Sequence, residues 1–213
     1  MRKTKEEAQK TKETILMAAL DCFSDQGYFN TSLDDIAKAA EVTRGAVYWH
    51  FSNKPEIFDA LHDSLHESFI EMITKDLERD SSEPLRQLEE LIIKLLKDLE
   101  RNETKTRTLK LFYHCDYSGD LNQFKQKHQD NKYKSLQLMS SYFQRAQQKG
   151  QLNKTAEPEI LTLTLHCFLK GILYEHLNGS TLININSHAE RLIKQLFNGL
   201  NDCHASLGCK GNS

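Results

Sequence analysis

One short stretch of the sequence combines a strong hydrogen-bond donor with small residues at helical spacing. Arg44 stands at its start, Gly45 and Ala46 follow directly, and Tyr48 lies one turn later. A guanidinium group can donate two parallel hydrogen bonds to the edge of a guanine, and this contact discriminates between bases by roughly 1–3 kcal/mol. Small neighbours let the backbone approach a base edge or a thymine methyl group. The chemistry indicated is hydrogen bonding in the major groove of DNA.

The flanking residues suit contacts with phosphates, which position a protein on DNA without reading its sequence. Tyr48 and His50 bring donors to the flank of the groove, and Lys54 combines an ammonium group with the free N–H groups at the start of a helix. Taken singly, Tyr48 or Trp49 is better explained by packing, and only the ordered string favours DNA binding. We expect the DNA contacts to come from Ser32, Thr43, Arg44, Gly45, Ala46, Tyr48, Trp49, His50 and Lys54.

Two short helices joined by a three-residue turn must position these side chains. Ser32 is suited to cap the first helix, and Thr43 to cap a second that runs to about His50. Val47 and Phe51 are four residues apart and can face the core, which turns the opposite face outward. This pattern predicts a helix-turn-helix, whose second helix enters the major groove.

The rest of the chain also reads as helix, and strand signals are nearly absent. We expect an all-α fold of about nine helices, in which three N-terminal helices form the helix-turn-helix domain. The predicted domains are residues 1–54 for DNA binding, 55–203 for ligand binding and dimerisation, and 204–213 as a flexible tail. The first predicted helix runs from about residue 5 or 10 to 26, the second over 33–40, the third from its cap at 43 to about 50, and the fourth from about 54 to a break at 81–84. The others span residues 85–100, 103–117, 121–149, 158–177 and 188–201.

Charge is distributed unevenly along the chain. The net charge is −2, so the whole chain is no basic nucleic-acid binder and any DNA-binding charge must be local. Residues 1–54 hold eight basic and eight acidic side chains, but the arm from Arg2 to Lys12 holds five basic residues against Glu6 and Glu7. We predict that this arm contacts phosphates or the minor groove.

Other chemistry receives little support. The five cysteines are odd in number and form no CxxC pair, which favours reduced thiols over a disulfide framework and leaves a redox sensor open. His62 and His66 are four apart, but no third metal ligand lies nearby in sequence. No Ser-His-Asp order, Gly-rich phosphate loop or HExxH motif is present. We expect no catalysis, metal or cofactor. Without an apolar leader or a membrane-spanning run, we expect a cytoplasmic protein.

The C-terminal half offers apolar helix faces for a partner subunit and a ligand. Residues 158–177 are apolar on more than one side, which predicts that this helix is buried on two sides. Together with the last helix it would form a homodimer interface. The alternative is a helix buried inside a monomer. A pocket in this half would be mostly apolar. Its predicted residues are Leu95, Phe112, Tyr113, Tyr133, Phe143, Phe168, Lys170, Ile172 and Tyr174.

The string from Leu33 to Lys54 strongly resembles the DNA-binding signature of the TetR/AcrR family. The opening from Arg2 to Ala8 and the string from Thr43 to Phe51 resemble the branch that represses multidrug efflux pumps. The specific resemblance covers about the first 60 residues. It implies a nine-helix homodimer that binds a palindromic operator and is released by a drug-like or bile-salt-like inducer. A sensor acting through protein partners and a structural helical adaptor are the alternatives.

Overall fold

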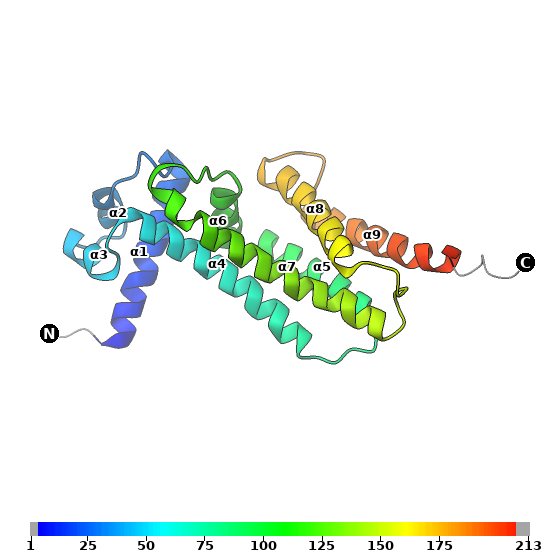
Figure 1. The fold of residues 1–213 in the computed structure, drawn as a ribbon. Coiled ribbons are helices and arrows are strands. Elements are labelled where there is room, and N and C mark those ends of the chain that lie inside the picture. The colour runs from blue at the N-terminus through cyan, green and yellow to red at the C-terminus, as the bar shows by residue number, and fades with distance from the viewer. Residues whose placement is uncertain (1–3, 208–213) are drawn as a thin grey trace, which may run out of the picture. The chain divides into compact units, whose positions relative to one another are not determined.

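A computed structural model describes residues 4–207, and the side chains of residues 4–200, as a chain of helices (Figure 1). The predicted all-α fold of nine α-helices is confirmed over this range. None of the described helices is long and apolar enough to cross a bilayer. The elements are α1 (Lys5–Gln26), α2 (Leu33–Ala39), α3 (Arg44–His50), α4 (Lys54–Leu77), α5 (Pro84–Arg101), α6 (Glu103–Tyr113), the 3₁₀ helix η1 (Gly119–Phe124), α7 (Lys125–Gln148), α8 (Pro158–Leu177) and α9 (Ile185–Leu207).

The chain divides into two compact units. The first comprises Met1–Glu67 and Thr104–His128, and the second comprises Ser68–Glu103 and Gln129–Ser213. Both α4 and α7 contribute one end to each unit. The unit that carries α1 to α3 therefore also holds the start of α4, nearly all of α6 and the segment after it. The functional boundary at residue 54 remains a prediction.

The first unit is built around a small aromatic and aliphatic core. Phe23 from α1 and Phe58 from α4 are almost completely buried, and the ring of Tyr28 lies 5.3 Å from the first and 5.1 Å from the second. Ile36 and Val47 close the core from α2 and α3, where each is fully buried. Packing on this shared core orients the two short helices, which are too short to be stable alone.

The second unit is organised around α5 and α9, which lie side by side. Their buried faces meet in one core, and Lys97 on α5 bonds Glu190 on α9 at 3.1 Å. The buried Tyr142 on α7 donates to the carboxylate of Asp76 at 2.8 Å. Among the largest buried side chains of this core are Ile73, Leu88, Ile92, Tyr142, Phe143 and Phe197.

Three predicted helix boundaries are wrong: the end of α6 and the start of α7, where tertiary packing overrides the local pattern, and the start of α9, where a different residue caps the helix. The helix predicted to reach residue 117 ends at Tyr113, and η1 precedes α7, because Leu121 turns into the core of the first unit and is only 1% exposed. The last helix begins at Ile185, where the side chain of Asn184 accepts from the N–H of Ser187, which was the predicted cap.

The last helix is longer than predicted, and flexibility of the tail stays a prediction. Helix α9 continues to Leu207 instead of ending near residue 201. Neither proline nor glycine interrupts residues 200–207, and the first glycine after them is Gly208. Residues 204–207 are therefore helical, while the rest of the predicted tail, 208–213, lies outside the described residues.

Candidate nucleic-acid interface

Helices α2 and α3 form the two arms of the predicted motif. The side chain of Ser32 accepts from the N–H of Asp35 at 3.1 Å, and that of Thr43 accepts from the N–H of Ala46 at 3.1 Å, so both predicted caps are present. Between the helices the chain turns at Glu41, whose φ of 53° is left-handed, and the N–H of Val42 bonds back to α2. The turn is therefore tight and closed by its own hydrogen bonds.

Helix α3 divides into a buried and an exposed face, as its sequence predicts. Val47 is fully buried and Phe51, which follows the helix, is 4% exposed. On the other side the side chain of Arg44 is 60% exposed, and Tyr48 and Trp49 are 45% and 71% exposed. Large aromatic side chains are costly to leave in water, so this face is suited to cover a partner. Three of the side chains predicted to contact DNA, Arg44, Tyr48 and Trp49, are thus accessible on the outer side of α3.

Arg44 is held at this surface by two neighbours. Its guanidinium pairs with the carboxylate of Asp34 on α2 at 3.1 Å and donates to the hydroxyl of Tyr48 at 3.3 Å. The hydrogen bond to Tyr48, and then the charge of Asp34, raise the pKa of Arg44 above its ordinary value. Both partners of the ion pair are half exposed, and such surface pairs contribute little to stability. The pair can therefore orient the guanidinium and still yield it to a base.

Nothing in the described structure requires a glycine at position 45. A Cβ atom built there would meet only the Thr43 hydroxyl, at an ordinary 3.8 Å. Its φ is not left-handed, so neither packing nor backbone conformation demands glycine. A residue that weakens helices is thus retained on the exposed face without an internal need. This supports close approach of an external surface to α3.

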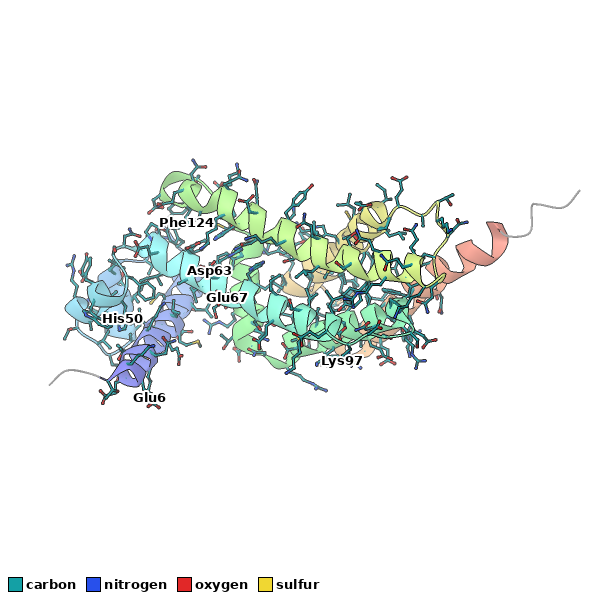
Figure 2. All side chains as sticks on the ribbon, turned by 60° about the horizontal axis from the view of Figure 1, so that its bottom comes forward. Glu6, His50, Asp63, Glu67, Lys97 and Phe124 are labelled. Atoms are coloured by element: carbon teal, nitrogen blue, oxygen red, sulfur yellow. The ribbon has the colours of Figure 1, made fainter. Side chains whose placement is uncertain are left out.

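His50, labelled in Figure 2, ends α3 and is partly buried. Its ring lies edge-on to Trp49 with centroids 4.5 Å apart. Ala46 sits one turn earlier and is also partly exposed. These three residues continue the accessible side of α3, and their DNA contacts remain predictions.

Lys54 has a role that its position in the sequence did not reveal. Its ammonium donates to the carbonyls of Tyr28 at 2.7 Å and Thr31 at 2.8 Å and lies 4.2 Å from the centre of the Tyr28 ring. Burial lowers its pKa. The lysine thus fastens the α1–α2 loop from within, and a phosphate contact by its ammonium stays a prediction. Ser32 is similarly engaged, because its hydroxyl donates to Asp35 at 2.6 Å.

The predicted basic arm is largely the first part of α1. Thr4 and Glu7 form a capping box, so the helix includes Lys5, Lys10 and Lys12. The ammonium of Lys12 lies 5.6 Å from the centre of the Phe51 ring. Arg2 and Lys3 lie outside the described residues. Any groove contact by residues 5–12 must therefore come from a helix and not from an extended strand.

The predicted ligand residues fall into three environments. Leu95, Phe143 and Ile172 are buried in the core of the second unit, and Phe168 is packed against that core. Tyr133 and Tyr174 are 68% and 52% exposed, and Lys170 is exposed as well. Phe112 and Tyr113 belong to the first unit. Within that unit the ring of Phe112 stacks edge-on against Phe58 at 4.8 Å. A shared pocket for these residues remains a prediction.

The first unit contains a cluster of histidines, of which the sequence pattern indicated only the pair His62 and His66. The rings of His62 and His128 stack with centroids 3.4 Å apart, and His66 lies 6.2 Å beyond His62. Lys127 on α7 bonds both Asp59 and Asp63 on α4, at 2.6 and 2.7 Å. Asp63 is labelled in Figure 2. Sequence reasoning found the His62–His66 spacing and missed the partners more than 60 residues away. Among the described residues no group of three His, Cys, Asp or Glu side chains is placed to hold a metal.

Comparison with known proteins places this geometry in a family. The HTH-type transcriptional regulator TtgR of Pseudomonas putida is 32% identical over 81% of this chain and 83% of its own length. The crystal structure of NalD, the secondary repressor of the MexAB-OprM multidrug efflux pump in Pseudomonas aeruginosa, superimposes with a TM-score of 0.78 at 32% identity, covering 92% of this chain and 98% of NalD. A SmeT–triclosan complex gives a TM-score of 0.81 at 28% identity, covering 90% and 91% of the two chains; another SmeT structure is described as the repressor of a Stenotrophomonas maltophilia efflux pump.

Two family profiles also match, and both agree with the helices described above. The profile of bacterial regulatory proteins of the tetR family matches residues 15–61, which include α2 and α3. The profile of the C-terminal region of MAATS-type transcriptional repressors matches residues 83–201, more than half of the chain. The chain therefore belongs to the TetR family of bacterial regulators and carries a MAATS-type repressor C-terminal region.

Proposed function

We propose that this protein is a homodimeric repressor that binds a palindromic operator, controls a multidrug efflux pump operon and leaves DNA when a small hydrophobic or amphipathic inducer binds. The exposed face of α3 carries this proposal. It presents Arg44 beside Gly45 and Ala46, above the buried Val47. A guanidinium group next to two small residues fits a base edge in the major groove.

The proposal of a dimer rests on α8. Thr162, Leu165 and Ile172 on this helix are buried, while Ile160 and Leu163 are 53% and 48% exposed. A helix with apolar residues on both faces has a second surface to bury, and a self-complementary contact with a second copy would bury it. A dimer would also present two recognition helices to the two half-sites of a palindrome, which lie about 34 Å or a multiple of this distance apart.

Control of an efflux pump is supported by the relatives. NalD and SmeT are described as repressors of multidrug efflux pumps, and SmeT has been crystallised with triclosan. We infer an apolar, drug-like inducer for this chain on the same basis. For release to occur, the inducer must bind the conformation with low DNA affinity more tightly than the other one.

The test is fluorescence anisotropy with labelled DNA taken from upstream of the protein's own gene and of any neighbouring transporter gene. We expect saturable binding that a scrambled duplex of equal length does not show, and dissociation on addition of triclosan. Binding without any response to triclosan or other pump substrates would remove the inducer proposal alone. Absence of binding to every upstream duplex would remove the repressor proposal.

The redox-sensor alternative is weakened by the surroundings of two thiols. Burial raises the pKa of Cys22, and it raises that of Cys115 to about 11. Thiolates, and not thiols, react with oxidants, so a raised pKa lowers the reactive fraction of both groups at neutral pH.

A further inference from the structure

The first unit contains a cavity that the proposed function does not use. Its volume is about 490 Å³, within the range of ligand sites in proteins. It lies between the end of α1, the loop that follows, and the end of α6. Its apolar wall consists of core residues of this unit: Phe23, Tyr28, Phe58, Leu111 and Leu121.

The wall is aromatic and partly open to water. Phe23, Tyr28 and Phe58 already pack on one another with tilted or edge-on geometry. Phe29 also lines the cavity, and although 63% exposed it packs edge-on against Tyr28 at 5.3 Å. A flat aromatic ring inserted beside these side chains would gain similar contacts and would cover the exposed ring of Phe29.

The opposite wall carries positive charge near the end of α6, from Arg107 and Lys110. Arg107, Lys110 and His114 follow one another at helical spacing and all line the cavity. Arg107 is already paired with Asp21 on α1 at 2.7 Å. Lys110 is exposed, and no ion pair joins it to any of the described side chains. Lys110 is therefore the cation that a ligand can engage without breaking an existing pair.

One carboxylate, that of Asp116, also lines the cavity. It is exposed like Lys110, so water screens both charges, and the two cations Arg107 and Lys110 outnumber this single carboxylate in the lining. The charge of the lining thus favours an anion over a cation. A ligand with both an apolar ring and an anionic group matches the two walls together.

We propose that this cavity binds an amphipathic organic anion, namely a planar aromatic carboxylate. Its ring lies among Phe23, Tyr28 and Phe29, and its carboxylate accepts a charge-assisted hydrogen bond from Lys110. The site belongs to the unit that contains α3 and includes none of the residues predicted for the inducer pocket. It is a second ligand site and does not depend on the proposed repressor function.

The probe is 2-naphthoate, with 2-naphthamide as its neutral analogue, titrated calorimetrically into the full-length protein without DNA. We expect 2-naphthoate to saturate one site per chain and to bind more tightly than the amide. Lys110→Gln should weaken binding of 2-naphthoate about fivefold to tenfold, because one charge-assisted hydrogen bond is lost, and should leave the amide unchanged. Lys94→Gln, which removes an equally exposed lysine from α5, is the matched control and should bind like wild type.

A second variant tests the cavity itself without changing charge. Ser24 is exposed and lines the cavity, so Ser24→Phe should fill the space, leave the fold intact and abolish binding of both probes. Amide chemical shifts on addition of 2-naphthoate should change in residues 107–121. Wild-type affinity in either Lys110→Gln or Ser24→Phe, shifts confined to other residues, or no binding by the unaltered protein would overturn the proposal. Because no DNA is present, failure of operator binding leaves this test unaffected.

Discussion

At the scale of single residues, Arg44 is the side chain proposed to recognise the base sequence of the operator. Its exposed guanidinium is oriented by Asp34 and Tyr48 and contributes little to the folded core. We expect Arg44→Ala to weaken operator binding about 5-fold to 150-fold, from the roughly 1–3 kcal/mol of a bidentate base contact, without changing the melting temperature. Anisotropy titration measures the effect, and Arg86→Ala on α5 is the control with the same change of charge. Equal loss in both variants, or none in Arg44→Ala, would contradict this role.

A second residue-scale prediction concerns His62. Burial, together with the nearby His128 and His66, lowers the pKa of His62 to about 3. Its Nδ1 has no hydrogen-bond partner among the described residues. The pKa of an unfolded histidine is about 6.5, so between pH 6.5 and 3 the unfolded chain binds a proton that the folded chain excludes. The contribution of His62 to the free energy of unfolding is fully present above pH 6.5. It is lost as the pH falls toward 3, by at most about 1.4 kcal/mol per pH unit.

Replacing this imidazole tests the sign of the effect. His62→Phe keeps a ring against Phe112 and His128 but removes the titration. The drop in melting temperature between pH 7 and pH 5, followed by circular dichroism, should shrink by roughly 2–6 °C. His114→Gln, a change at an exposed histidine, should leave the drop as in wild type. An unchanged drop in His62→Phe would show that other groups carry the acid sensitivity.

At the scale of elements, we propose that the exposed face of α3 approaches DNA closely. Gly45 can accept a Cβ without a clash, so Gly45→Ala should stabilise the fold by a few tenths to about 1 kcal/mol. The added methyl group should nevertheless reduce operator affinity about tenfold, because it separates α3 from the groove. Melting temperature and anisotropy are measured together. Increased stability with wild-type affinity would remove the argument for close approach.

The accuracy of the sequence predictions also differs between elements. Helices α2 and α3 were predicted with their caps, because Ser32 and Thr43 bond to backbone groups only three residues away. The end of α6 and the site of Lys54 were not, because each depends on distant contacts. Leu121 is pulled into a core formed by other helices, and Lys54 meets carbonyls 23 and 26 residues away. Local signals in one sequence contain no information about such pairs.

At the scale of the whole molecule, function is proposed to require two copies. Leu163 on α8 is half exposed although apolar, so Leu163→Glu should place two charges in the proposed interface and raise the dimer dissociation constant at least about a hundredfold. Leu182→Glu makes the same change at a more exposed leucine outside α8 and is the control. Sedimentation velocity measures the result. A Leu163→Glu protein that sediments like wild type would place any interface elsewhere.

The family was predicted from the string between Leu33 and Lys54, and the family matches confirm it. The ligand pocket was not foreseeable to the same degree. Apolar spacing identifies buried faces, but it does not separate a residue packed in the core, such as Phe143, from one that lines a cavity. That distinction depends on how several helices pack, which the sequence pattern leaves open.

The most direct measurement is a DNase I footprint of the full-length protein on DNA upstream of its own gene. The account predicts protection of a palindromic segment with half-sites a whole number of helical turns apart, and loss of that protection in Arg44→Ala at the same concentration. Uniform cleavage across the upstream DNA at saturating protein, or a footprint that Arg44→Ala reproduces in full, would contradict it.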